Sequence, residues 1–197
     1  MKVIGISSSP RKEGNTELLL LEFLRGARES GAETQLFVLR RMDIAPCQHC
    51  DGCLAEGKCV VKDDMWLIYP ELEGLDALVL ASPIQFYGLT APAKAMIDRC
   101  QAFWARKYVL KRPLSERPRK GVFISVGGTK SRDLFEPAKA TVKIFFRTID
   151  VEYWGELLYR GVDEKGAIRQ HPTALKEAFV LGKRLVEEAV ILAEKGS

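Results

Sequence analysis

The sequence predicts an α/β fold built on a doubly wound, five-stranded parallel sheet, strand order 2-1-3-4-5, with helices on both faces. Short runs rich in β-branched residues alternate with longer helical patterns, which is typical of strand–helix–strand units in a parallel sheet. The length of 197 residues, with 47% hydrophobic and 28% charged residues, fits one ordinary domain. We therefore expect a single domain over residues 1–197.

Each element follows from its local pattern. Strands are predicted at 2–6, 35–40, 76–82, 121–126 and within 152–162. Helices are predicted at 15–31, from about Asp64, at 91–104, at 133–149 and from about Thr173 to Glu194. Gly31 closes the first helix. This arrangement is flavodoxin-like, and such sheets bind their ligand between strands 1 and 3, where the strand order reverses.

Charge and hydropathy exclude several classes of partner. The formal net charge of +4 is mild, and no basic stripe is interleaved with aromatic residues, so nucleic acid is not expected as a partner. No apolar run approaches the roughly 20 residues of a membrane-spanning helix. The N-terminal segment MKVIGISSS is too short and polar for a signal peptide. We expect a cytoplasmic protein that does not associate with a membrane.

The segment ISSSPRKEGNTE, residues 6–17, joins the first strand to the first helix. Backbone N–H groups and the helix dipole at such a junction attract anions. Short polar and basic side chains add to this site: Ser7, Ser8, Ser9, Arg11, Lys12, Asn15 and Thr16. The segment matches neither the dinucleotide fingerprint nor the Walker loop, so a monophosphate such as FMN fits better. Alternatively, the serines only cap the helix.

Two further loops follow predicted strands at the same edge of the sheet. SPIQFYGLTAPAK, residues 82–94, offers apolar surface to a flat ring, and VGGTKS, residues 126–131, has two glycines that allow close backbone approach. Aromatic residues at strand ends are more often part of a core than of a cofactor wall. The two loops support a ligand site because they share an edge with the first loop.

Four of the five cysteines fall in one short segment with the spacing C-x2-C-x2-C-x5-C: Cys47, Cys50, Cys53 and Cys59. Structural zinc sites usually join two cysteine pairs that are a dozen or more residues apart. The compact run approximates the cysteine spacing of bacterial ferredoxins and favours an iron-sulfur cluster over zinc or free thiols. Cys100 lies in a predicted amphipathic helix and is interpreted as a buried apolar residue.

Together these segments resemble a known family. SSSPRKEGN, CQHCDGCLAEGKCVVKDDM, SPIQFYGLTAPAKAMIDR and SVGG occur in the order found in the iron-sulfur flavoproteins, within the wider group of NAD(P)H-dependent FMN reductases. The likeness runs over nearly the whole chain, and the cysteine spacing is its most specific part. It implies a flavodoxin-like fold, one FMN and one 4Fe-4S cluster per chain, and a homodimer or dimer of dimers.

The resemblance also implies a role for particular residues. The four clustered cysteines, in a cysteine loop at residues 46–60, would ligate iron. The FMN phosphate would be held by Ser7, Ser9, Arg11, Asn15 and Thr16. The flavin ring would be lined by Pro83, Ile84, Phe86, Tyr87, Gly88, Gly127 and Gly128.

The implied function is electron transfer from a one-electron donor such as ferredoxin, through the cluster and FMN, to oxygen, peroxide or a quinone. In the expected strand order the cysteine loop leaves strand 2, so a neighbouring subunit's cluster would come closer to the flavin. One alternative is an NAD(P)H-dependent FMN or quinone reductase without an iron-sulfur cluster. Another is a non-enzymatic sensor that uses the thiols as its redox switch.

The segment 105–120 carries seven basic residues against Glu116 alone. It is either a docking surface for an acidic ferredoxin or an exposed, solvated loop.

Overall fold

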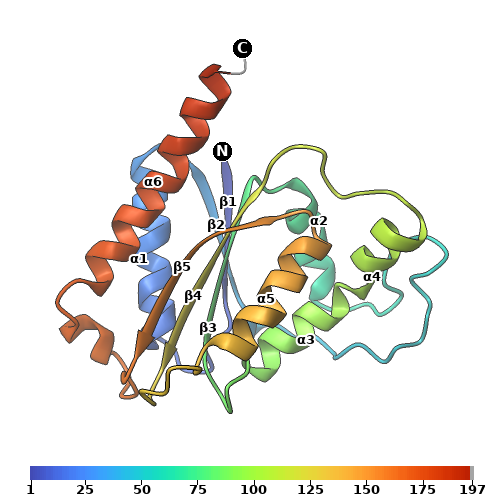
Figure 1. The fold of residues 1–197 in the computed structure, drawn as a ribbon. Helices are drawn as coiled ribbons and strands as arrows, with labels where there is room; N and C mark the ends of the chain where they lie inside the picture. The colour runs from blue at the N-terminus through green and yellow to red at the C-terminus, as the bar shows by residue number, and fades with distance from the viewer. Residues whose placement is uncertain (196–197) are drawn as a thin grey trace.

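The computed structural model describes residues 1–195 and contains a five-stranded sheet (Figure 1). Its strands are β1 (Lys2–Ser7), β2 (Glu33–Val38), β3 (Ala77–Pro83), β4 (Lys120–Gly127) and β5 (Glu152–Arg160). Neighbouring strands pair in parallel in the order β2-β1-β3-β4-β5. The flavodoxin-like sheet and its strand order, both predicted from the sequence, are confirmed.

Helices cover both faces of the sheet (Figure 1). One face carries α1 (Asn15–Glu29) and α6 (Ala174–Lys195), and the other carries α2 (Met65–Gly74), α3 (Ala91–Arg99), α4 (Gln101–Trp104) and α5 (Glu136–Thr148). Successive strand residues face opposite sides, so in β1 Val3 packs beneath α1 while Ile4 packs into the core of the other face. Each face therefore has its own apolar core.

The segments between these elements are short turns or irregular chain. The 3₁₀ turns η1 (Leu39–Arg41) and η3 (Ala167–Gln170) precede the cysteine loop and α6, and the π-helical turn η2 (Ala105–Val109) extends α4. Most predicted boundaries differ from the structure by one to three residues, and two of the differences change the element itself. The helix expected at 91–104 is broken at Cys100 into α3 and α4, and the strand expected at 35–40 ends at Val38, where η1 begins.

All five strands run in one direction, so their carboxyl ends share one edge of the sheet. The loops after β1, β3, β4 and β5 meet at this edge (Figure 1). The connection from η1 to α2 runs instead beside α3 and α4 and carries the clustered cysteines. Within the described part of the chain, none of the helices combines the length and the apolar character needed to span a bilayer.

Candidate functional site

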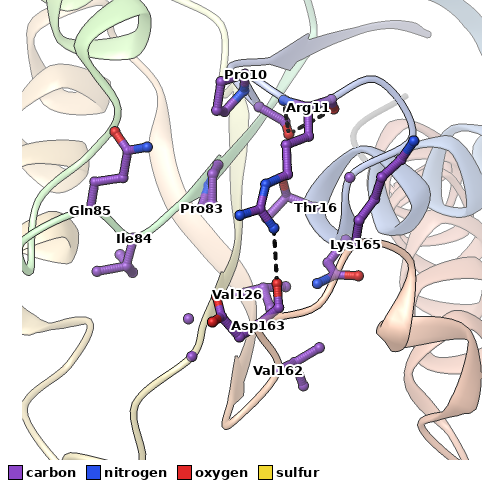
Figure 2. Close-up of a pocket in the computed structure, with 15 residues that line it drawn as sticks. Pro10, Arg11, Thr16, Pro83, Ile84, Gln85, Val126, Val162, Asp163 and Lys165 are labelled. Carbon is purple, nitrogen blue, oxygen red and sulfur yellow. Dashed lines mark hydrogen bonds between the residues drawn. The ribbon is translucent and has the colours of Figure 1, made fainter.

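A pocket of about 180 Å³ lies at the carboxyl edge of the sheet. It is built from the loops that follow β1, β3, β4 and β5 together with the start of α1 (Figure 2). Its lining consists of Ser9, Pro10, Arg11, Gly14, Asn15, Thr16, Pro83, Ile84, Gln85, Val126, Gly127, Gly128, Val162, Asp163 and Lys165. This is the position at which doubly wound sheets bind their ligands.

The start of α1 provides polar groups that lack partners. No side chain caps its first turn, and the first N–H groups of a helix have no partner within the helix. The Thr16 hydroxyl is buried and makes no hydrogen bond to any described residue. Ser9 Oγ accepts from Arg11 N at 3.2 Å, and Gly14 leaves no room for a side chain because a Cβ there would lie 2.5 Å from this oxygen. The tight loop thus presents N–H groups and a free hydroxyl to an anion.

The opposite wall of the pocket is apolar. Ile84 N donates to Val126 O at 3.0 Å, which joins the loops after β3 and β4. A Cβ on Gly127 would lie 2.7 Å from the Leu134 side chain, so glycine permits this close packing. Figure 2 shows Pro83 and Ile84 on the side of the pocket away from Arg11 and Thr16. The pocket therefore has a cationic, hydrogen-bonding side and an apolar side.

The loop after β5 closes a third side of the pocket. Arg11 Nη1 donates to Asp163 O at 3.0 Å (Figure 2). The Asn15 side chain donates from Nδ2 to Glu164 O at 2.9 Å and accepts from Ile168 N at 3.2 Å. The Asn15 amide is thus engaged by the protein itself and fixes the loop after β5 to α1.

The tip of the loop after β3 is exposed and does not line the pocket. Gln85 and Gly88 exchange two backbone hydrogen bonds of 3.0 and 2.9 Å, so Phe86 and Tyr87 form the tip of a tight turn. Both have left-handed backbones, with φ of 48° and 63°. The Phe86 side chain is fully exposed. Non-glycine residues rarely adopt this conformation, and such strain often marks a ligand-binding or switch segment.

The structure brings most of the predicted cofactor residues together. Eight of the twelve line the pocket: Ser9, Arg11, Asn15, Thr16, Pro83, Ile84, Gly127 and Gly128. Ser7 is buried and does not line the pocket, and Phe86, Tyr87 and Gly88 lie at the exposed turn. The sequence analysis did not name Val162, Asp163 or Lys165, although the loop after the fifth strand leaves the sheet at the same edge. Whether each residue contacts a cofactor stays a prediction.

The two ends of the cysteine loop are held together by hydrogen bonds. Asp43 N donates to Asp64 Oδ2 at 2.8 Å, and Asp64 N donates to Asp43 O at 3.0 Å. Ala45 N donates to Asp63 Oδ2 at 2.9 Å. Asp63 also binds the buried guanidinium of Arg99 at the end of α3. These contacts fix where the loop leaves and rejoins the body of the domain.

The four clustered thiols lie in one neighbourhood. Burial raises the pKa of the Cys53 thiol, and nearby Cys59, Cys47 and Cys50 raise it further. No three histidine, cysteine, aspartate or glutamate side chains within residues 1–195 are placed to hold a single metal ion. Cys100, between α3 and α4, is buried in the core, and burial raises the pKa of its thiol, in agreement with its interpretation as a core residue.

Four of the seven cations of segment 105–120 are engaged within the chain. Arg106 pairs with Glu73 at 3.1 Å, and Lys107 pairs with Asp150. Arg119 is buried and Lys120 pairs with Glu188. Within residues 1–195, Lys111, Arg112 and Arg117 are exposed and make no ion pair, so the charge available for docking is smaller than the sequence indicates.

With the site described, the chain can be compared with known proteins. A family model described as NADPH-dependent FMN reductase matches residues 1–149. The chain belongs to the NADPH-dependent FMN reductase family.

Relatives refine this assignment. An iron-sulfur flavoprotein of Archaeoglobus fulgidus is 41% identical over 128 residues, covering 65% of this chain and 63% of that protein. An iron-sulfur flavoprotein of Methanocaldococcus jannaschii is 37% identical over 147 residues, covering 74% of this chain and 71% of that protein. The match thus spans less than two thirds of the Archaeoglobus protein. The resemblance predicted from the sequence is confirmed.

Solved structures support the fold of this FMN reductase family member. The NAD(P)H:quinone oxidoreductase from Methanothermobacter marburgensis aligns with a TM-score of 0.69 at 19% identity, covering 94% of this chain and 96% of that chain. At this identity the likeness shows the fold alone.

The pocket residues fit the FMN implied by the family. An unpaired buried hydroxyl, an uncapped helix start and a guanidinium suit a phosphate, while Pro83, Ile84 and Val126 suit an apolar ring. The cysteine loop fits an iron-sulfur centre in its donor chemistry, four neighbouring thiols, and in one adjacent unpaired buried donor, Arg99 Nε.

Proposed function

We propose that this chain is a flavin-dependent oxidoreductase that binds FMN in the pocket at the carboxyl edge of the sheet. The observation that carries the proposal is the start of α1, where the buried Thr16 hydroxyl has no partner among the described residues and no side chain caps the helix. Both features disfavour an empty pocket, because buried polar groups and helix ends are normally paired. A phosphate would pair them.

The pocket residues have separate tasks in this proposal. Ser9, Arg11 and Thr16 bind the phosphate, and the tight turn at Gly14 positions the N–H groups of α1. Pro83 and Ile84 exclude water from one side of the pocket. Bound FMN would supply chemistry in steps of one or two electrons.

The cysteine loop is proposed to hold a 4Fe-4S cluster on Cys47, Cys50, Cys53 and Cys59, as the names of the relatives suggest. Such a cluster exchanges one electron at a time, which suits a ferredoxin-like donor. The acceptor is proposed to be small: oxygen, peroxide or a quinone. The cysteine loop runs beside α3 and α4, away from the edge where the pocket opens, so a homodimer that brings a second chain to the pocket is part of the proposal.

The test is the cofactor content of anaerobically purified protein. FMN, iron, inorganic sulfide and zinc are measured on one sample of the wild type and of two matched variants, Cys50→Ala and Cys100→Ala. We expect about four iron and four sulfide per FMN in the wild type. Cys50→Ala should lose iron, because it removes a proposed ligand of the cluster. It should keep FMN, because Cys50 is exposed in the cysteine loop and does not line the pocket. Cys100→Ala should keep both, because Cys100 lies in the core.

Other outcomes point to the alternatives. FMN with zinc or without metal, combined with rapid flavin reduction by NADPH or NADH, would assign a simple FMN or quinone reductase. Absence of both FMN and iron, with reversible oxidation of the thiols, would contradict the enzymatic proposal and favour a thiol sensor.

A further inference from the structure

Arg99 is a buried cation whose side chain binds both ends of the cysteine loop. It stands at the last position of α3 and is 1% exposed. Nη1 donates to Ala45 O at 2.9 Å and to Asp63 Oδ2. Nη2 donates to Val61 O at 3.0 Å and to Asp63 Oδ1 at 3.2 Å. Ala45 precedes the four cysteines and Val61 follows them.

One donor of this guanidinium remains unused. Nε is buried and has no hydrogen-bond partner among residues 1–195. A buried donor without a partner costs about 1–3 kcal/mol, so this N–H is available to an acceptor.

Arg99 lies at the Cys59 end of the cysteine loop, because Nη2 donates to Val61 O, two residues after Cys59. Cys59 and Tyr69 line one pocket. Burial by itself would lower the pKa of Arg99, but its contacts with Asp63 and then with Cys59 raise it instead. The hydroxyl of Tyr69 donates to Arg99 O at 2.8 Å, and Cys59 contributes to the raised pKa of Tyr69 after burial and Cys100. Cys59 therefore lies near both Arg99 and Tyr69.

We propose that Arg99 is a positioning and charge-compensating residue for the redox centre of the cysteine loop, with Nε–H donating to the sulfur of Cys59. The inference rests on the proposed function, because it needs a centre on the four cysteines. Reduction of such a centre adds one electron and no atom, so its charge becomes more negative by one unit. Arg99 favours that reduced state because a nearby buried cation interacts most strongly with the more negative form.

Asp63 makes the inference testable because it has the opposite charge at the same place. It binds the same guanidinium and also accepts from Ala45 N and Met65 N. If Arg99 only clamps the loop, loss of either partner loosens the same contact and has the same effect. If Arg99 acts through its charge, loss of the cation and loss of the anion shift the reduction potential in opposite directions.

The matched control is Arg119, a second buried arginine with an unpaired Nε. It is 3% exposed and donates to Ile149 O and Leu72 O, and no cysteine contributes to its pKa. Arg119→Gln therefore also removes a buried cation, but one that contacts Ile149 and Leu72 and not the cysteine loop.

The experiment measures the midpoint potential of the iron-sulfur signal by anaerobic dithionite titration, with iron content and unfolding recorded on each sample. We expect Arg99→Gln to lower the potential and Asp63→Asn to raise it, each by at least a tenfold change in the reduction equilibrium, which is 59 mV for one electron. Arg119→Gln should leave the potential unchanged. Arg99→Lys should lie between Arg99→Gln and the wild type, because it keeps the charge and loses the fork of donors.

Loss of iron in Arg99→Gln alone, with a raised potential in Asp63→Asn, would also support the proposal. Shifts of the same sign in the two variants, equal loss of iron in both, or unchanged potentials would overturn it and leave Arg99 as a clamp. Wild-type protein without iron would contradict the proposed 4Fe-4S cluster and this inference with it, and metal analysis would show that before any variant is made.

Discussion

Arg11 and Asp163 are joined by a hydrogen bond of 3.0 Å from Nη1 to a main-chain carbonyl oxygen, although 152 residues separate them. The bond links the loop after β1 to the loop after β5 and places a cation at the wall of the pocket. Lys12, the next residue, is exposed and does not line the pocket. Substitutions of Arg11 and Lys12 therefore distinguish a direct contact with the phosphate from long-range electrostatic attraction by the loop.

The first prediction concerns the charge of Arg11. Arg11→Gln should weaken FMN binding about tenfold, since a hydrogen bond to a charged group contributes about 1.5–3 kcal/mol and this side chain is partly solvated. Lys12→Gln removes the same charge and should change affinity by less than about twofold. Fluorescence titration of the apoprotein with FMN gives both values. Equal losses in the two variants would mean that only the net charge of the loop matters.

The second prediction concerns the unpaired hydroxyl of Thr16. Thr16→Val removes it with little change of shape, so the apoprotein should be as stable as the wild type or more stable by about 1 kcal/mol. FMN affinity should fall about tenfold. Urea unfolding and FMN titration measure the two effects. Thr148→Val on α5, where the hydroxyl donates to Ile144 O, is the control that should leave FMN affinity unchanged. Unchanged FMN affinity in Thr16→Val would remove this hydroxyl from the site.

The fold was largely predictable because its strands and helices follow local patterns. The errors lie at the ends of elements, where the contacts of single residues set the boundary. The second strand ends at Val38 because the chain turns into η1, where Arg40 pairs with Glu17 at 2.8 Å. The expected helix 91–104 breaks at Cys100, whose N–H donates to Ile97 O at 3.0 Å, the third residue before it and not the fourth. Neither contact leaves a periodic signal in the sequence.

The candidate site was predictable at the level of loops and less so at the level of side chains. Loop positions follow from the topology, which brings the carboxyl ends of the strands to one edge. The topology does not determine the direction of each side chain. Asn15 donates to Glu164 O, and the Phe86 side chain is exposed to solvent. Asp163 and Lys165 were missed because their loop, residues 161–166, has neither the run of serines of the first loop nor the adjacent glycines of the loop after the fourth strand.

The third prediction concerns the crossing of α1 and α6. A Cβ on Gly26 would lie 2.0 Å from Phe179 O, and one on Gly182 would lie 2.0 Å from Phe23 O. Gly26→Ala should lower the free energy of unfolding by about 2–3 kcal/mol, because backbone cannot move aside as a flexible side chain can. Gly74 stands at the end of α2, where an added Cβ would meet no atom within 4 Å. Gly74→Ala should leave the free energy of unfolding unchanged or raise it by up to about 1 kcal/mol. Similar values for both variants in urea unfolding would mean that the helices separate at little cost.

The fourth prediction is a pH dependence of stability at Glu188. Hydrogen bonds from Arg184 and Lys120 lower the pKa of its carboxyl to about 2, against the opposing effect of burial. A lowered pKa in the folded state means that the ion pairs stabilise the fold above the ordinary pKa of about 4.5 and that this contribution is lost as the pH falls toward about 2. Because the side chain is 36% exposed, Glu188→Gln should cost only about 1 kcal/mol at pH 7.

That difference should shrink steadily as the pH falls below about 4.5. Glu187→Gln removes the same charge from an exposed neighbour and should change the free energy of unfolding by no more than about 0.5 kcal/mol at pH 7. Urea unfolding of the wild type and both variants at several pH values tests this. A Glu188→Gln difference that stays constant from pH 7 to pH 3 would show that Glu188 contributes through its neutral hydrogen bonds and not through its charge.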